Sequence, residues 1–250
     1  MIPATKSGGG DDRLAGMLPA ELVPFFDDRF VGSCALFEEY VQRLALQVVR
    51  ITGLDAAARE PETPGGIAAR AGLEPGRAPV MVGWLLATLA SRGWAARDGD
   101  GRYTIPAPLP DLDPREVAEA QERHDPSSLP SYRMADVAAS LYPSVLRGVA
   151  GGEETMFAPE RIGGWLEYFS NDNLIYAISN RIGAFAAERA LHGDGGRVLE
   201  LGGGLGSGAA AFLERFTETG ANSGSLGVFE AKFLMRLMQA NARMFDKFGA

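Results

Sequence analysis

Residue types that build common covalent and metal sites are scarce in this sequence. Its 250 residues contain one cysteine, Cys34, and two histidines, His124 and His192, which lie far apart. A disulfide needs two cysteines, and a Cys/His metal site needs several ligands at short spacing. The sequence therefore excludes a disulfide within the chain and predicts no metal site.

Positive charge and long apolar runs are also scarce. The chain has 24 Lys and Arg against 32 Asp and Glu, which gives a formal net charge of −8. An acidic chain has no general attraction for nucleic-acid backbones or anionic membranes, so we expect neither as a partner. No apolar run approaches the roughly 20 residues that cross a bilayer, and the first 13 residues lack the pattern of a secretion signal. We therefore expect a cytoplasmic protein.

Apolar residues make up 46% of the chain, enough for a sizeable core. Residues 1–28 read as a flexible tail, rich in Gly and Asp at the start. Residues 36–52 follow, with apolar side chains at the spacing of one helix face. That stripe consists of Leu36, Phe37, Tyr40, Val41, Leu44, Val48 and Val49.

The sequence after this helix predicts a winged-helix domain over residues 29–110. A short helix within 63–73 ends at Gly72, and a second helix points Met81, Leu85, Leu86 and Leu89 inward. Residues 94–105 then form two strand-like pieces around a turn. Helix, turn, helix and hairpin in that order are typical of a winged helix.

A winged helix either reads DNA or mediates dimerisation. In the hairpin turn Arg97 and Arg102 are accompanied by Asp98 and Asp100, and the second helix brings little basic charge. A DNA reader should present a basic face. The scarcity of basic charge, together with the apolar stripe of helix 36–52, therefore favours a homodimer over nucleic-acid binding.

The C-terminal half predicts a helical linker followed by an α/β segment. Residues 111–192 contain helical stretches at 132–149 and 159–191, and Asn171-Asp172-Asn173 interrupts the second. From 193 the pattern changes. We predict strand 197–201, helix 208–216, strand 225–230 and helix 233–248, which is the opening of a parallel α/β sheet.

The first strand of that segment runs into the glycine-rich stretch Val-Leu-Glu-Leu-Gly-Gly-Gly-Leu-Gly-Ser-Gly at residues 198–208. Glycines allow a sharp turn and close approach of a ligand, and the following helix N-terminus offers free N–H groups. A P-loop needs a Gly-Lys-Ser/Thr ending, which is missing here. Gly204, Gly206 and Ala209 fit a loose GxGxxA dinucleotide pattern. Glu200, Gly202, Gly204 and Gly206 fit ExGxGxG.

The ExGxGxG pattern resembles the first motif of class I S-adenosylmethionine (SAM) methyltransferases. The order of elements is similar to small-molecule methyltransferases of plant and antibiotic-tailoring type. Residues 141–148 and 168–180 also resemble the C-methyltransferase domains of polyketide synthases, and the likeness covers most of residues 36–250. The fold expected is a mainly α winged-helix and dimerisation domain, followed by the start of a Rossmann-like α/β methyltransferase domain at 193–250.

The resemblance implies a set of SAM-binding residues. Glu200 would face the methionine part, and Gly202, Gly203, Gly204 and Gly206 would form the turn beside it. Glu230 ends the next predicted strand and would hold the ribose, although a surface acid ends strands equally well. Tyr176 and Asn180 precede the first strand and would cover the cofactor, or else serve packing and capping.

The function implied is transfer of a methyl group from SAM to a small molecule, in secondary metabolism. The alternatives are a non-catalytic SAM-binding or dimerisation fragment, and a winged-helix transcriptional regulator. A methyltransferase sheet of this class has seven strands, whereas the sequence predicts two, so we expect a truncated product with little activity by itself. No residue is identified as the catalytic base.

Overall fold

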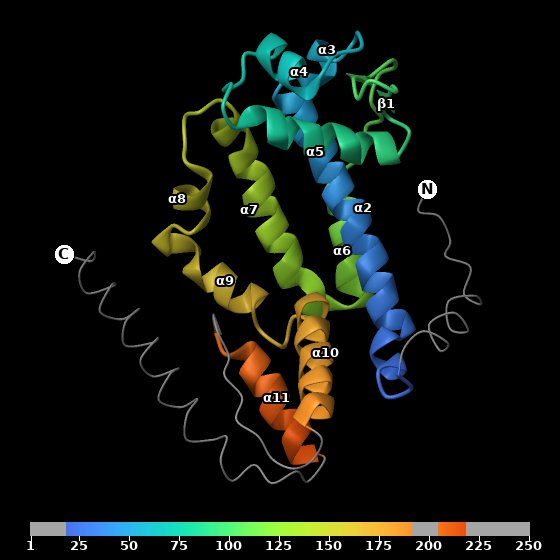
Figure 1. The fold of residues 1–250 in the computed structure, drawn as a ribbon, viewed down its shortest axis with the longest axis vertical. Coiled ribbons are helices and arrows are strands. Elements are labelled where there is room, and N and C mark those ends of the chain that lie inside the picture. Colours follow the sequence, from blue (N-terminus) through green and yellow to red (C-terminus); the bar gives the residue numbers. More distant parts are fainter. Residues whose placement is uncertain (1–18, 192–204, 219–250) are drawn as a thin grey trace, which may run out of the picture. The chain divides into compact units, whose positions relative to one another are not determined.

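The computed structural model describes residues 19–191 and 205–218, shown as the coloured ribbon in Figure 1. The chain divides into two compact units. The central unit is Val31–Trp165, and the terminal unit combines Met1–Phe30 with Leu166–Ala250. The domain limits drawn from the sequence at residues 28, 110 and 192 stay predictions.

The central unit is built mostly from helices. Its elements, in chain order, are α2 (Asp28–Ile51), α3 (Leu54–Ala57), α4 (Pro64–Arg70), α5 (Ala78–Ser91), β1 (Ala96–Arg97), β2 (Tyr103–Thr104), α6 (Pro114–His124), η2 (Pro126–Ser128), α7 (Leu129–Leu146), α8 (Gly152–Met156), η3 (Pro159–Arg161) and α9 (Ile162–Tyr168). The strands pair antiparallel, with Ala96 opposite Thr104 and Arg97 opposite Tyr103. Elements therefore follow in the order that the sequence predicted, while the winged-helix assignment itself stays a prediction.

Local chemistry explains the boundaries of α4 and the hairpin. Thr63 caps α4 by accepting a hydrogen bond from the Gly66 amide, and Pro64 occupies the first turn. Beyond the helix, Gly72 has a φ of 67°, which favours glycine and ends the helix at the predicted place. In the hairpin, Gly101 supplies the positive φ of 78° that the tight turn requires.

Most of the apolar stripe of α2 is covered inside the central unit: Tyr40, Leu44, Val48 and Val49 are buried, whereas Leu36, Phe37 and Val41 are half-buried. Its C-terminal half enters a core formed with α3, α4, α5 and β2. Its middle packs through Tyr40 and Leu44 against Val117 of α6 and Tyr132 of α7, three helices that run alongside one another in Figure 1. The largest fully buried apolar side chains of this unit are Leu46, Leu54, Ile67, Leu85, Leu86, Leu89, Ile105, Leu146, Val49, Val82 and Val117. Burial of apolar area of this kind is the main stabilising contribution to a fold.

Helix α6 was not predicted from the sequence. Asp113 caps it by accepting a hydrogen bond from the Arg115 amide, and Pro114 follows as the first helical residue. Its buried face is narrow, formed by Pro114, Val117 and Gln121. So short an apolar stripe leaves little periodic signal, whereas the Asp-Pro start is the signal that identifies the helix.

The terminal unit contains η1 (Val23–Phe26), α10 (Leu174–Leu191) and α11 (Ser207–Glu218). The break at Asn171-Asp172-Asn173 and the predicted end of the second stretch at residue 191 agree with α10. Helix α11 covers the predicted helix 208–216. Strands 197–201 and 225–230 and helix 233–248 lie outside the described residues, so the Rossmann-like sheet stays a prediction.

Helices α10 and α11 pack through small and aromatic side chains. Ala184 of α10 meets Ala211, Phe212 and Phe216 of α11. The rings of Phe212 and Phe216 lie 4.3 Å apart between centroids. Alanines let the two helices approach closely, and the phenylalanines fill the space beside them. Arg215 of α11 adds an ion pair with Glu188 at 2.7 Å.

Two further findings concern the described residues only. None of their helices is long and apolar enough to cross a membrane. Among them, no group of three or more His, Cys, Asp or Glu side chains is placed to hold a metal ion.

Candidate functional site

The described end of the glycine-rich stretch is a turn that leads directly into α11. Gly206 has a φ of 77°, and its carbonyl accepts the Ala210 amide at 2.8 Å, which opens the helix. A side chain at that φ is strained by roughly 1–2 kcal/mol, which explains glycine at this position. The other predicted cofactor residues, Glu200, Gly202, Gly203, Gly204 and Glu230, lie outside the described residues, so their roles stay predictions.

The first residue of α11 is held by the loop between α9 and α10. The Ser207 hydroxyl donates to the Phe169 carbonyl at 2.5 Å. The Asn171 side-chain amide donates to the Ser207 carbonyl at 2.8 Å. Asn180 of α10 in turn donates to the Asn171 Oδ1 at 2.8 Å. Three hydrogen bonds therefore connect the end of the glycine turn, through the loop, to α10.

Tyr176 belongs to an aromatic cluster on the same loop. Its ring lies 5.3 Å from that of Phe169 and 5.8 Å from that of Tyr168, between centroids. Tyr176 and Asn180 are four residues apart, so they share one face of α10. The structure thus brings both residues predicted on α10 to the loop that bonds Ser207, Asn180 through Asn171 and Tyr176 through the aromatic cluster.

The loop itself is fixed by Asn173, which is fully buried. Its side-chain amide donates to the Tyr168 carbonyl at 2.8 Å. Its backbone carbonyl accepts the amides of Tyr176 and Ala177 and so begins α10. The Asn-Asp-Asn motif therefore has two tasks: Asn173 starts the helix, whereas Asn171 contacts α11.

The contacts of Asn171 and Ser207 were missed from the sequence. Both residue types offer side-chain hydrogen bonds, and both stand beside a predicted break, in the helix interruption and after the glycines. These positions indicate that both side chains form hydrogen bonds, but they do not identify the bonding partner. Residues 36 positions apart meet here, and a single sequence does not reveal that distance in space.

A small cavity of about 230 Å³ opens between η1, α10 and α11. It is lined by Phe25, Arg181, Ala184, Phe185, Ala211, Glu214 and Arg215. The guanidinium of Arg181 lies over the Phe25 ring at 5.8 Å, and that of Arg215 lies over the Phe185 ring at 5.2 Å. Sites for whole small molecules are usually 300–1,000 Å³, so this cavity is too small for one.

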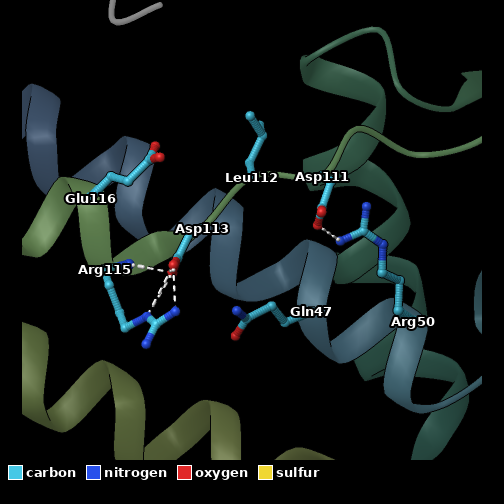
Figure 2. A pocket seen from close by; sticks show the side chains of 7 residues that line it. All are labelled: Gln47, Arg50, Asp111, Leu112, Asp113, Arg115 and Glu116. Carbon is cyan, nitrogen blue, oxygen red and sulfur yellow. Dashed lines mark hydrogen bonds and ion pairs between the residues drawn. The ribbon is translucent and has the colours of Figure 1, made fainter.

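A larger pocket of about 640 Å³ lies in the central unit, between α2 and the start of α6. Figure 2 shows the side chains that line it: Gln47, Arg50, Asp111, Leu112, Asp113, Arg115 and Glu116. It contains none of the residues that the sequence predicted for a cofactor.

The charges of this pocket are largely paired with one another. Arg50 binds the carbonyls of Leu109 and Pro110 and lies 3.4 Å from the Asp111 carboxylate. Arg115 binds the Asp113 carboxylate at 2.8 Å, and these hydrogen bonds hold the pKa of Asp113 below its ordinary value. The arginines therefore fasten the chain before α6, and we assign the pocket a structural role.

Comparison with known proteins yields a structural likeness. No model of a known protein family matches the chain, and no curated protein does either. Among solved structures, the crystal structure of the CurJ carbon methyltransferase is similar, with a TM-score of 0.62 and 20% sequence identity. The match covers 82% of this chain and 55% of that protein, so the chain spans little more than half of its length. The described residues therefore share the fold of a methyltransferase.

Proposed function

We propose that this chain is a SAM-dependent methyltransferase acting on a small molecule, and that it holds SAM at the glycine turn 200–206. The observation that carries the proposal is the ExGxGxG stretch, whose last glycine has a φ of 77° and opens α11. The fold likeness to a carbon methyltransferase supports it independently. Secondary metabolism is part of the same proposal and rests on the sequence resemblance.

Bound SAM supplies a methyl group on a positively charged sulfur, which leaves readily when a nucleophile attacks the methyl carbon. The protein's own contribution is to hold donor and acceptor in line. In this proposal the glycines let the backbone approach the cofactor, Glu200 faces its methionine part and Glu230 binds the ribose hydroxyls. Tyr176 and Asn180 belong to α10, the helix that covers the site in this proposal.

Binding of S-adenosylhomocysteine, the demethylated product, tests the site directly by calorimetric titration. We expect Gly204→Val and Gly206→Ala to weaken binding tenfold or more, because a side chain obstructs the ligand or strains the turn. Gly53→Ala is a matched control, since Gly53 has a similar φ of 74° and open space around it. Equal affinities for the wild type and both turn variants would refute the site.

The ribose role of Glu230 has its own test. Glu230→Ala removes two charge-assisted hydrogen bonds, worth about 1.5–3 kcal/mol each, so we expect at least a tenfold loss of SAM affinity. A SAM analogue without both ribose hydroxyls provides the control. If the variant weakens binding of that analogue as much as binding of SAM, Glu230 does not contact the ribose.

No observation on the described residues favours the alternative function, a winged-helix transcriptional regulator. In a winged helix the second helix of the motif enters the DNA groove, and that position corresponds to α5. Helix α5 contains no charged residue, and its exposed residues include Val80 and Trp84. DNA recognition depends on cations against phosphates. Nucleic-acid binding is therefore not part of the proposed function.

The homodimer expected from the sequence stays a proposal. The apolar stripe of α2, which suggested the dimer, packs mostly inside the chain itself, and Leu36, Phe37 and Val41 stay half-buried. The proposal now rests on the order of elements at residues 29–110. Light scattering at tens of micromolar protein tests it, and a monomer mass there would contradict it.

A further inference from the structure

The hydrogen bonds around Ser207 carry an inference beyond the identity of the cofactor. We propose that Asn171 is a positioning residue. It fixes the first turn of α11 and thereby sets the direction in which the glycine turn enters the helix. The Asn171 amide acts through the Ser207 carbonyl, and Asn180 acts through Asn171. This inference rests on the proposed function, because the turn matters only if it holds the cofactor.

A glycine-rich turn needs hydrogen bonds from outside the turn to fix its conformation. Residues 202–204 and 206 are glycines, and glycine restricts the backbone less than any other residue. A cofactor bound by backbone groups loses affinity when those groups must first be ordered, so a hold from outside the turn raises affinity.

Asn180 fixes the orientation of the Asn171 side-chain amide. An asparagine side chain carries an acceptor oxygen and a donor nitrogen on opposite sides. The Asn180 amide donates to the Asn171 oxygen, so the Asn171 nitrogen is the group that turns toward the Ser207 carbonyl. The Ser207 hydroxyl donates to the Phe169 carbonyl and holds the same residue from a second side. Ser207 is therefore bound to the loop by both its side chain and its backbone.

The positioning role is separable from the packing of the two helices. Ala184, Ala211, Phe212 and Phe216 hold α10 and α11 together further along α11, where the pair Arg215–Glu188 adds to them. Loss of the Asn171 contact leaves that packing in place and loosens the first turn of α11, which then keeps only the Ser207 hydroxyl bond to the Phe169 carbonyl. We therefore expect Asn171 variants to lose cofactor affinity while they keep most of their stability.

The test measures three properties of wild type and Asn171→Ala: S-adenosylhomocysteine affinity by calorimetry, amide hydrogen exchange by residue, and the thermal midpoint. We expect a tenfold or greater loss of affinity, faster exchange at the Ala210 amide, which donates to the Gly206 carbonyl, and a midpoint within a few degrees of wild type. Exchange at Phe212 and Phe216 should stay unchanged. Asn171→Asp keeps the shape but removes the donor, and should behave like Asn171→Ala.

Asp172→Ala is the matched control. Asp172 lies in the same loop and is exposed, and its carboxylate accepts a hydrogen bond from the Ser170 hydroxyl within that loop. Its replacement should change neither affinity nor exchange in α11. If Asp172→Ala has the same effect as Asn171→Ala, the loop acts as a whole and the specific role of Asn171 is wrong.

A double-mutant cycle separates Asn180 from Asn171. If Asn180 acts only through Asn171, Asn180→Ala causes no further loss in the Asn171→Ala background. An additional loss there would mean that Asn180 contacts the cofactor directly, and would overturn the inference that Asn180 acts through Asn171.

Failure of the function and failure of the inference are distinguishable. If wild type binds no S-adenosylhomocysteine, the proposed function fails and the cofactor role of Asn171 fails with it, while exchange at the Ala210 amide still reports whether Asn171 fixes the first turn of α11. If wild type binds and Asn171→Ala binds equally well, the positioning role alone is overturned.

Discussion

Gln121 connects three helices of the central unit through its side chain. The residue is fully buried on α6. Its amide nitrogen donates to the Ser33 hydroxyl of α2 at 3.0 Å and to the Asp125 carbonyl at 2.7 Å. Its oxygen accepts the Tyr132 hydroxyl of α7 at 3.0 Å. Buried polar groups are stable when every partner is satisfied, and this amide satisfies three.

We expect Gln121→Met to lower the free energy of unfolding by about 2–4 kcal/mol, because it leaves several buried polar groups without a partner. Tyr132→Phe removes one hydroxyl and should cost less, about 1–2 kcal/mol. Urea unfolding followed by circular dichroism measures both. A Gln121→Met variant as stable as wild type would mean that the network contributes nothing to stability.

Glu39 on α2 belongs to a network of ion pairs in the same unit. It pairs with Arg43 and Arg92, each at 2.8 Å, and Arg43 also reaches Glu116 of α6 at 2.9 Å. Burial alone would raise the pKa of Glu39, but the hydrogen bonds and charges of Arg43 and Arg92 outweigh it and lower the pKa. A lowered pKa in the folded state stabilises the protein above the ordinary carboxyl pKa, and that stability is lost as pH falls through the folded pKa.

Glu39→Gln should therefore destabilise the protein at pH 7, and the difference from wild type should shrink as the pH falls from about 5 to about 3. Urea unfolding at a series of pH values measures the difference. Glu122→Gln, at an exposed position of α6, serves as the control and should show little difference at any pH. A gap for Glu39→Gln that stays constant with pH would contradict the ion-pair explanation.

At the scale of elements, the contact between α10 and α11 depends on small residues. Ala211 is buried against Ala184, whereas its neighbour Ala210 is exposed on the same helix. We expect Ala211→Leu to cost about 1–3 kcal/mol, because the added atoms push the helices apart. Ala210→Leu should be nearly neutral. Thermal unfolding of the two variants compares them, and equal stabilities would argue against close packing at Ala211.

The predicted elements differ from the observed ones where the periodic signal is weak. The apolar stripe of residues 36–52 located the C-terminal half of α2, but the helix begins earlier, at Asp28. Leu85, Leu86 and Leu89 are buried on α5, as the sequence predicted. Helix α6 was not predicted because its buried face is narrow and leaves little apolar periodicity. Strong periodicity thus locates helices well, whereas their starts depend on caps and neighbours.

At the scale of the whole molecule, the central unit has its own core. Helices α2 to α5, β2 and the end of α7 share one buried cluster that includes Leu46, Ile67, Leu86 and Leu146. A unit with its own core should fold by itself. We expect a segment of residues 28–165 to be helical by circular dichroism and to unfold cooperatively in urea. A segment without a cooperative transition would mean that it depends on the terminal unit.

The sequence by itself determined the strongly periodic helices and the glycine motif. Both are local properties: a helix repeats its apolar side chains every three or four residues, and a sharp turn requires glycine where φ is positive. From Asn171, Asn173 and Ser207, the sequence could predict only that polar residues stand beside the helix break and the glycine turn.

Only the tertiary structure decided which of these residues meet. Asn171 bonds Ser207 across 36 residues, and Gln121 bonds Ser33 across 88. The apolar stripe of α2 faces the chain's own core, a result that periodicity alone does not give. Periodicity identifies the face of a helix that avoids water, whereas the partner that covers the face depends on how distant segments pack.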